Sequence, residues 1–387
     1  MIARIFIFII LAIVLPDVYV YARYLRRRTD ITLWQHFLWW FPGVVMIAYT
    51  AALSLIRDFA PANIMWLNAY LFLLGLVVVP KFLFVLCSAA GLLLRRVLHL
   101  RRNWGNYVGL VLALASLYVL IYGSTVGIDK VRVRRVEISV NGLPQAFSGY
   151  RIVQFSDAHL GSVNPDLLQQ AVLKINGLKP DAIVFTGDLQ NMQPGEINRF
   201  AHALGTLKAA DGVYSVLGNH DYSMYLDVPE AEKRRNEALL RSKERSLGWR
   251  LLLNDHAVVR RGADSIVIAG TENDGRPPFP SRADYAKALR QVSGSAFIVM
   301  LQHDPSAWRR HILPATKVQL TLSGHTHGGQ VSLFGVRPTE FTGVEDDGLY
   351  GESGRWLFVS TGLGGFIPFR YGIPPEVVEI TLRAPKR

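Results

Sequence analysis

Long apolar runs fill roughly the first third of the chain. Four of them reach the roughly 20 mostly apolar residues that a helix needs to cross a bilayer. Trp34, Trp66 and Trp104 fall near the ends of runs, where aromatic residues act as interfacial anchors. We therefore predict a helical membrane region over residues 1–128, with about four spans at about 5–24, 33–54, within 66–94 and 106–126.

Two of these runs allow more than one interpretation. The first could be a signal peptide, but the residues after it, 24–28, read Tyr-Leu-Arg-Arg-Arg and contain no small-residue cleavage pattern, so we favour a retained span. Lys81 follows Pro80 inside the third run. For this lysine we favour a kink with a snorkelling or locally paired side chain over a polar contact with Asp17 of the first run.

From about residue 131 the pattern changes to short apolar strands, several of which end in a polar tip and lead into a helix. This rhythm predicts an α/β domain over residues 129–387, with two sheets, flanking helices and functional groups at the strand ends. The charged segment 222–248 predicts a solvated helical insertion that could act as a lid. Strands are expected at 131–140, 151–155, 182–185, 213–217, 265–270, 297–301, 317–322 and 356–360, and helices at about 165–177 and 195–208.

The net charge of +12 first suggests a nucleic-acid partner. However, the first 130 residues hold 12 of the 42 lysines and arginines but only 4 of the 30 aspartates and glutamates. Most of the excess thus lies beside apolar runs, as the positive-inside bias of membrane proteins produces. We expect a membrane partner and no nucleic acid.

The positions of the arginine clusters predict an orientation in the membrane. Residues 26–28 follow the first run, and residues 95–102 with four arginines follow the third. If both loops are cytoplasmic, the fourth span exits outward and the domain after it is extracytoplasmic, with the chain in the cell (inner) membrane. Lys130, Arg132 and Arg134 follow the fourth run and oppose this orientation.

Two other features exclude functions. The single cysteine, Cys87, lies inside an apolar run, so neither an internal disulfide nor a cysteine-based zinc site can form. The glycine-rich stretch 362–365 lacks the strand-loop-helix context that dinucleotide binding requires.

Metal-binding chemistry is indicated by the polar strand tips. A lone aspartate after a strand is usually a helix cap, but here five tips carry histidine, aspartate or asparagine in one domain. Oxygen and imidazole ligands without thiolate suit Mn, Fe or Zn ions. Two such ions in close proximity need a bridging carboxylate to offset their repulsion, and Asp188 is the natural bridge. The residues concerned are Asp157, His159, Asp188, Asn219, His220, His303, His325 and His327.

These tips resemble the five sequence blocks of the calcineurin-like metallophosphoesterases, an αββα fold. The blocks read Asp157-x-His159, Gly187-Asp188, Gly218-Asn219-His220-Asp221, His303 and Gly324-His325-x-His327. The resemblance covers about residues 150–383. The form of the first and last blocks and the ending Gly362-x-Gly364 with Pro374-Pro375-Glu376 are similar to a membrane-associated bacterial branch.

The resemblance implies a role for each residue. Asp157, His159 and His327 would bind one divalent ion, Asn219, His303 and His325 a second, and Asp188 both. His220 would stabilise the transition state or protonate the leaving group. Asp221 would orient His220 or cap a helix, and Asp304 would support His303 or cap the turn before Pro305. For His36, His99, His202, His256 and His311 we expect surface or structural roles.

The predicted function is a dinuclear-metal-dependent phosphoesterase acting on a phosphomonoester or phosphodiester. Four spans exceed what a tether needs, which suggests a lipid or lipid-linked substrate, and the apolar string 366–369 could touch lipid or pack internally. Some relatives cleave the pyrophosphate of UDP-diacylglucosamine, which would require a cytoplasmic domain. A non-catalytic membrane scaffold or sensor is the alternative from another class, and the oligomeric state is left open.

Overall fold

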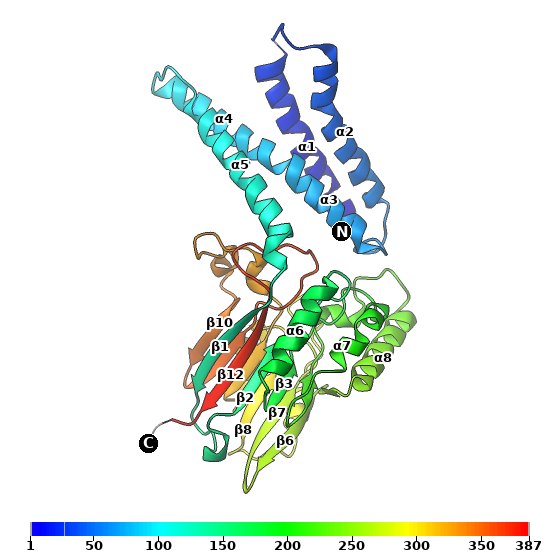
Figure 1. Cartoon of the computed structure of the whole chain (residues 1–387), viewed down its shortest axis with the longest axis vertical. Helices are drawn as coiled ribbons and strands as arrows, with labels where there is room; N and C mark the ends of the chain where they lie inside the picture. The colour runs from blue at the N-terminus through cyan, green and yellow to red at the C-terminus, as the bar shows by residue number, and fades with distance from the viewer. Residues whose placement is uncertain (1, 27, 386–387) are drawn as a thin grey trace. The chain divides into compact units, whose positions relative to one another are not determined.

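The computed structural model describes residues 2–26 and 28–385 and divides into two compact units, residues 1–125 and 126–387. The first unit is helical (Figure 1). Four of its segments are long and apolar enough to cross a membrane: Ile2–Leu25, Leu33–Ser54, Ile64–Val97 and Trp104–Ile128. Its α-helices are α1 (Phe6–Val20), α2 (Leu33–Ser54), α3 (Ile64–Val77), α4 (Val79–Val97) and α5 (Trp104–Ser124).

A buried ion pair joins the first span to the third. Lys81 Nζ lies 2.6 Å from Asp17 Oδ1 and 4.9 Å from the centre of the Trp39 ring. The Trp39 indole N–H in turn donates to the backbone oxygen of Asp17. Lys81 therefore forms the polar contact with Asp17, and not the snorkelling or local pairing that the sequence favoured. A charge in a span is costly unless it is paired, and the pair ties three helices together.

A second polar cluster links α1, α4 and α5. Ser88, fully buried, lies within hydrogen-bond distance of the hydroxyls of Tyr19 and Tyr24. Tyr24 also donates to Asn106, and Asn103 donates to the backbone oxygen of Ser88. The helices α4 and α5 approach closely because small residues lie between them. A Cβ on Gly105 would clash with the backbone of Cys87.

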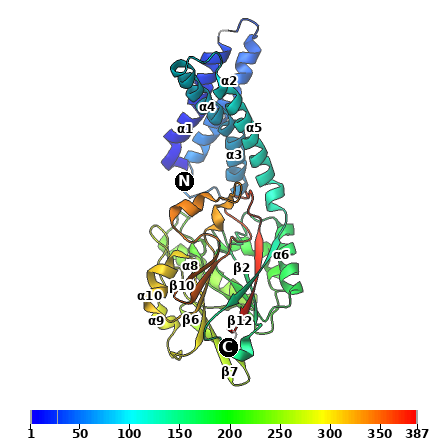
Figure 2. The same cartoon turned by 90° about the vertical axis from the view of Figure 1, so that its left-hand side faces the viewer.

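The second unit contains two six-stranded mixed sheets (Figures 1 and 2). The first has the order β1-β12-β2-β3-β4-β5 and the second β10-β11-β9-β8-β7-β6. The strands of the first are β1 (Arg132–Ser139), β2 (Arg151–Phe155), β3 (Ala182–Phe185), β4 (Val213–Ser215), β5 (Arg250–Leu251) and β12 (Glu376–Arg383). Those of the second are β6 (Asp255–Arg261), β7 (Asp264–Gly270), β8 (Phe297–Leu301), β9 (Leu320–Ser323), β10 (Gly348–Glu352) and β11 (Arg355–Val359).

Helices cover the outer face of each sheet. On the first sheet lie α6 (Pro165–Gly177), α7 (Ala201–Leu204) and α8 (Glu230–Ser246), and on the second lie α9 (Tyr285–Ala288) and α10 (Leu313–Ala315). The helix α6 has the expected bounds because Asn164 caps it through its side chain and Pro165 opens it. The expected helix at 195–208 is broken into a 3₁₀ turn, Pro194–Arg199, and the four-residue α7. In the segment 222–248 only α8 is an α-helix.

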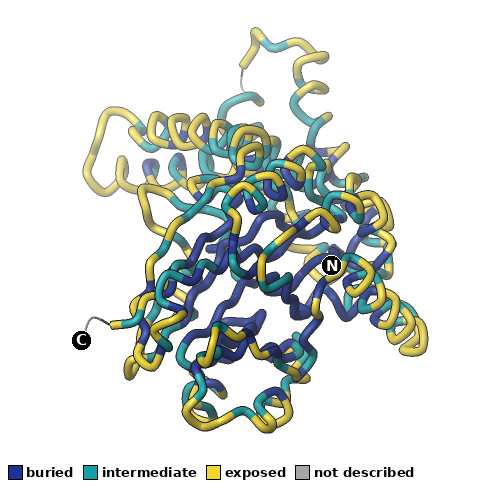
Figure 3. Tube along the Cα trace, turned by 60° about the horizontal axis from the view of Figure 1, so that its bottom comes forward, coloured by how far each residue is buried: buried dark blue, intermediate teal, exposed yellow. Residues whose placement is uncertain are grey.

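Strand alternation builds the layers. In β2 and β3, Val153, Phe155 and Ile183 face the helices, whereas Ile152 and Val184 face the second sheet. The inner strands β3, β8 and β9 are buried along their whole length, whereas the edge strands β1, β6 and β10 are mostly exposed or half-buried. Figure 3 shows the buried segments as a dark interior. The helix-sheet-sheet-helix order confirms the predicted αββα class.

Strand direction sets where the functional loops gather. The strands β2, β3 and β4 run parallel, as do β7, β8 and β9, so the carboxyl ends of each trio meet at one edge of their sheet. The strand β12 runs antiparallel to β2, and β1 runs parallel to β12. The chain therefore enters β1 at the same edge at which β2 ends.

Candidate metal centre

Eight polar side chains converge at the carboxyl ends of five strands. Asp157 and His159 follow β2, Asp188 follows β3, Asn219 and His220 follow β4, His303 follows β8, and His325 and His327 follow β9. Five of the eight are almost fully buried, while His220, His325 and His327 are half-buried and line the opening. The structure thus brings together every ligand that the sequence predicted.

The first group of ligands consists of Asp157, His159 and His327, whose donor atoms lie within 4.8 Å of one another. The Nε2 atoms of His159 and His327 are 3.3 Å apart, and His327 Nε2 is 3.5 Å from Asp157 Oδ1. Two imidazole nitrogens and a carboxylate oxygen facing one another in a buried place form a cage for a cation.

The second group is built around His303. Its Nε2 lies 3.2 Å from Asp188 Oδ2 and 3.2 Å from Asn219 Oδ1, and His325 Nδ1 lies 3.3 Å from the same nitrogen. Asp188, His303 and His325 again have donor atoms within 4.8 Å of one another. The four side chains therefore form a second cage beside the first.

A single oxygen connects the two groups. Asp188 Oδ2 lies 3.2 Å from His303 Nε2 in one group and 3.8 Å from His159 Nε2 in the other. The other oxygen of Asp188 accepts the backbone N–H of His220 at 2.8 Å. Asp188 is therefore held with one oxygen committed to the chain and one directed between the two cages.

Hydrogen bonds at the far ring nitrogens aim the histidines. His159 Nδ1 is 3.1 Å from Asn191 Oδ1, and His303 Nδ1 is 2.7 Å from the backbone oxygen of Thr186. Each of these rings donates from Nδ1, so the lone pair of Nε2 faces the cage. His220 Nδ1 likewise donates to the backbone oxygen of Asn191 at 2.7 Å.

The amide of Asn219 is oriented in the same way. Its Nδ2 donates to the hydroxyl of Tyr225 at 2.7 Å, which leaves Oδ1 directed at His303. The Tyr225 ring also stacks on His220 with a centroid distance of 4.3 Å. One tyrosine therefore positions a candidate ligand and a candidate catalytic group.

Burial keeps two imidazoles of the site neutral and available as ligands, whereas a neighbouring carboxylate favours the protonated form of a third. Burial lowers the pKa of His159 to about 3 and that of His325 to about 4, so both rings are neutral at ordinary pH. Burial raises the pKa of Asp157 to about 6. Although burial opposes it, the charge of Asp188 raises the pKa of His303 to about 10, and His303 holds the pKa of Asp188 well below its usual range. Positive charge is thus stabilised where the carboxylates converge, as a cation site requires.

Backbone geometry shows that the loops are built to hold these side chains. Asp157, His159, Asp188, His325 and His327 all have φ between 47° and 76°, a left-handed region that is strained for residues with a Cβ. A Cβ at Gly218 would clash with the Asp188 carboxylate, and one at Gly324 with that of Asp157. Positive φ also occurs at eight other non-glycine residues among those described, but five of the eight candidate site residues share it. The donor set and this backbone support fit two divalent ions.

Asp221 serves a purpose other than orienting the His220 ring. Its carboxylate is fully buried and accepts backbone N–H groups of Asp188, Leu189 and Gln190 and also that of Gly218. It therefore clamps the loop after β3 onto the loop after β4. The ring of His220 is oriented by the Asn191 carbonyl instead.

Asp304 caps its turn, and its carboxylate lies beside His325 rather than supporting His303 as one interpretation expected. It accepts the backbone N–H of Ser306, which is a cap, and its Oδ2 lies 3.8 Å from Nε2 of His325. Of the histidines expected outside the site, His256 contacts the backbone oxygen of Ala288 and His311 contacts Asp274.

Three residues that support the site were not identified from the sequence. Asn191 lies three positions after Asp188, and Tyr225 lies six after Asn219, with no motif to mark either. Arg370 is buried and donates to the backbone oxygens of Thr361 and Gly364. That loop packs on Asp157, because a Cβ at Gly362 would clash with the Asp157 side chain.

Replacing Asn191 with Ala should weaken metal binding while leaving His220 in place. The change removes the acceptor for His159 Nδ1 but keeps the backbone carbonyl that holds His220. Loss of such a partner typically lowers metal affinity or activity by about 10- to 100-fold. Metal content after graded dialysis would measure it, with Asn141→Ala on the exposed turn as control. Equal retention by both variants would contradict this role for Asn191.

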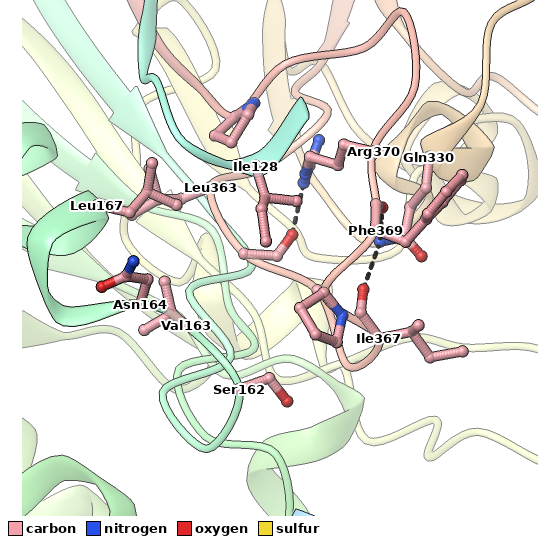
Figure 4. A pocket seen from close by; sticks show the side chains of 14 residues that line it. Ile128, Ser162, Val163, Asn164, Leu167, Gln330, Leu363, Ile367, Phe369 and Arg370 are labelled. Carbon is pink, nitrogen blue, oxygen red and sulfur yellow. Dashed lines mark hydrogen bonds between the residues drawn. The ribbon is translucent and has the colours of Figure 1, made fainter. Parts of the chain in front are cut away.

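An apolar pocket opens beside the metal centre (Figure 4). It is lined by Val163 and Leu167, by residues 363–365 and 367–370, and by Ile128 and Gln330. Gln330 donates to the backbone oxygens of Ile367 and Phe369, which ties the last metal-binding block to this segment. The ring centroid of Phe366, in the same segment, lies 5.7 Å from that of His220, so the segment that lines the pocket also contacts the candidate centre.

The chain combines a membrane unit with an αββα unit that holds two adjacent carboxylate–histidine groups. These features define its class, a membrane protein with a dinuclear type of metal centre. Residues 150–329 match the family described as "Calcineurin-like phosphoesterase", and residues 3–128 match "Probable Calcineurin-like phosphoesterase, transmembrane domain". The chain belongs to the calcineurin-like metallophosphoesterases, which use a dinuclear metal centre, and it is a multi-pass membrane protein.

Three relatives illustrate the range of the family. A "Transmembrane protein with metallophosphoesterase domain" of Danio rerio is 34% identical over 72% of this chain, which spans 64% of that relative's length. The "Uncharacterized metallophosphoesterase YkuE" of Bacillus subtilis is 32% identical over 62% of this chain and 82% of its own. The "UDP-2,3-diacylglucosamine pyrophosphatase LpxG" of Chlamydia trachomatis is 28% identical over 61% of this chain and 85% of its own.

Proposed function

We propose that this chain is a metal-dependent hydrolase that cleaves a phosphate ester at the convergence of the five strand-end loops. The observation that carries the proposal is the position of Asp188 Oδ2 between the two cages, 3.2 Å and 3.8 Å from a histidine of each. Asp157, His159 and His327 hold one ion, Asn219, His303 and His325 the other, and Asp188 both. Two divalent ions in such a site supply Lewis acidity toward the phosphoryl oxygens and make a nucleophile available near neutral pH.

Within the chain, His220 is the proposed proton donor to the leaving group. One of its ring nitrogens lies within 4.8 Å of donor atoms of His159 and Asp188, and the ring is half-buried, so it is open to a substrate. The Asn191 carbonyl and the Tyr225 ring fix its orientation. A donor that is already positioned contributes by avoiding reorganisation during the reaction. The other candidate residues act as metal ligands, and the ions that they hold position the phosphate.

The metals are proposed to be Mn, Fe or Zn ions. The donor set consists of imidazole nitrogens and carboxylate or amide oxygens, and this set favours those ions over Ca²⁺ and Mg²⁺, which prefer oxygen alone. Thiolate ligation plays no part, because Cys87 is in the other unit.

The proposed substrate is a phosphomonoester, phosphodiester or pyrophosphate that carries an apolar group. Two observations support it: the apolar pocket shares the Phe366 segment with the metal centre, and the protein resides in a membrane. The resemblance to the UDP-2,3-diacylglucosamine pyrophosphatase of Chlamydia trachomatis supports a lipid-linked pyrophosphate as one candidate. A non-catalytic scaffold is disfavoured because each expected ligand position holds a side chain that can bind a metal.

The catalytic unit is proposed to lie outside the cytoplasm, in a protein of the inner membrane. The arginines at 26–28 and 95–102 favour this sidedness. A C-terminal reporter that is active only outside the cytoplasm would show activity if this is right. Activity of a cytoplasm-only reporter would instead favour the UDP-diacylglucosamine pyrophosphate reaction.

Metal removal should abolish turnover and metal addition should restore it. The detergent-purified full chain is expected to hydrolyse bis-p-nitrophenyl phosphate or p-nitrophenyl phosphate after loading with Mn²⁺. Treatment with a chelator should lower the rate at least ~10³-fold, because both the electrophile and the nucleophile are lost. Two ions per chain by elemental analysis together with turnover would support the proposal. A chain that binds no metal and turns over neither ester would overturn it.

A further inference from the structure

The turn that follows the last metal-binding block exposes large apolar side chains. We call residues 331–343 the apolar loop; its side chains Leu333, Val336 and Phe341 are 45%, 47% and 82% exposed, and Phe334 is fully exposed. Ile367 of the neighbouring segment adds a further apolar side chain that is 38% exposed. Single exposed apolar residues are common, but a cluster around one loop marks an interaction surface.

The tip of the apolar loop has a strained backbone conformation, which costs the fold some stability. Leu333 and Val336 exchange two backbone hydrogen bonds of 2.9 Å and 3.0 Å, which closes a two-residue turn over Phe334 and Gly335. Both turn residues have positive φ, 54° at Phe334, where glycine or asparagine is the favoured residue. Because Phe334 is strained in its backbone and buries nothing, the unit itself gains no stability from this side chain. The side chain is therefore available to contact something outside the unit.

The apolar loop is anchored to the metal centre. Its residues Arg337 and Thr339 donate to the carboxylate of Asp346, and Thr326, between the ligands His325 and His327, donates to the backbone oxygen of Asp346. At the base of the loop Ser332 donates its N–H to the backbone oxygen of Tyr371. Anything that binds the tip is therefore held at a fixed place relative to the last two histidine ligands.

The apolar loop also lies at the end where the chain arrives from the membrane. The strand register puts the start of β1 at the edge where β2 ends and the metal-binding loops begin. Ile128, which ends the fourth candidate span, lines the same pocket as Gln330 and Ile367. Between the end of α5 at Ser124 and Arg132 only a few residues remain, and seven residues reach at most about 25 Å.

We propose that the apolar loop inserts its tip into the interfacial layer of the bilayer that holds the spans, so that the metal centre works against the lipid surface. The occupant of the surface is lipid rather than a protein, because a bilayer is within reach of the chain that enters this edge. Phenylalanine and leucine are also the side chains that interfacial segments bury to a depth of about 5–10 Å. Membrane contact stands apart from the proposed function; only its consequence, access to a bilayer-resident ester, rests on that function.

A label at the tip tests the contact directly. In the full chain with Cys87→Ser, Phe334→Cys would carry an environment-sensitive fluorophore, and Ala263→Cys in a separate chain would be the control. Ala263 is exposed at the turn between β6 and β7, and β7 begins at the opposite end of its sheet from the metal-binding loops. Both chains are reconstituted into vesicles of phosphatidylcholine and phosphatidylglycerol in equal amounts.

The label at 334 should emit at shorter wavelength, be quenched by lipids with a nitroxide near the headgroup, and be protected several-fold from aqueous iodide. The label at 263 should show the reverse. Equal iodide quenching at the two positions would overturn the proposal. Protection at 334 without lipid quenching, rising with protein concentration, would also overturn it in favour of a second copy of the chain.

A kinetic arm tests the consequence. In the same vesicles, the triple variant Leu333→Ser, Phe334→Ser, Phe341→Ser should lose about tenfold or more in rate on phosphatidyl-p-nitrophenol embedded in the bilayer. Its rate on water-soluble bis-p-nitrophenyl phosphate should stay within about twofold. Equal losses on both esters, or none on the embedded one, would overturn the proposed consequence. If the unsubstituted chain hydrolyses neither ester, the hydrolase function fails, and the fluorescence still decides whether the loop contacts lipid.

Discussion

Replacing Asp188 with Asn is expected to lower phosphoesterase activity at least ~10³-fold and to reduce bound metal from two ions per chain to one or none. Two divalent ions about 4 Å apart repel each other by on the order of 16 kcal/mol at an effective dielectric of 20, since each carries two charges. Asp188 Oδ2 faces a histidine of each cage. Its negative charge is therefore what allows the cages to fill together.

The Asn substitution is chosen because it preserves the fold around the site. Its amide oxygen can still accept the backbone N–H of His220, a bond that Asp188 Oδ1 makes at 2.8 Å. Elemental analysis, circular dichroism and the ester assay would be compared with Asp166→Asn, an exposed aspartate in the first turn of α6. Two tightly bound ions in the Asp188→Asn chain would disprove bridging by this residue.

The sequence predicts that these candidate ligands lie close together because their signal is local. Each candidate ligand follows an apolar strand, and strand direction gathers the tips of each sheet at one edge. The packing of the two sheets then brings the two edges together. Positions such as Asp157 and His325 can thus be assigned from a few neighbouring residues. The same is true of α6, whose start is marked by Asn164 and Pro165.

Features that depend on distant partners could not be predicted in this way. The strands β1 and β12 pair although they lie more than 200 residues apart in the sequence. The apolar alternation of β1 therefore could not predict its partner strand. In the sequence, Asn191 cannot be told from other loop asparagines. Only the fold shows that its side chain forms a hydrogen bond with His159. Lys81 likewise meets Asp17 only when the first and third spans pack. In each case the local pattern allows several partners, and tertiary packing selects one.

The backbone conformations at the site cost the fold some of its stability. Five candidate ligands have left-handed backbone conformations. The loop of one of them, Asp188, is held by the carboxylate of Asp221, which accepts four backbone N–H groups. Gly218 and Gly324 closely approach the carboxylates of Asp188 and Asp157. Each left-handed residue with a Cβ costs on the order of 1 kcal/mol or more. A rigid frame of this kind keeps the histidines close together before any metal binds, which reduces the reorganisation that binding requires.

Replacing His220 with Ala is expected to lower kcat by about 10²- to 10⁴-fold while both metals stay bound. His220 Nδ1 is committed to the Asn191 carbonyl, and in our proposal the ring supplies a proton rather than a ligand. The loss should depend on the leaving group. An alkyl phosphate ester releases a strongly basic alkoxide and needs the proton, whereas a p-nitrophenyl ester releases a weakly basic phenolate and needs it less.

The measurement is therefore kcat, KM and metal content for both kinds of ester, with His202→Ala on the exposed face of α7 as the matched control. A larger loss on the alkyl ester identifies His220 as the proton donor. Equal losses on both esters, with metals retained, would assign it to stabilising charge on the phosphoryl group instead. Loss of a metal ion in His220→Ala would exclude both roles and make His220 a ligand, because its ring nitrogen also lies within 4.8 Å of the donor atoms of His159 and Asp188.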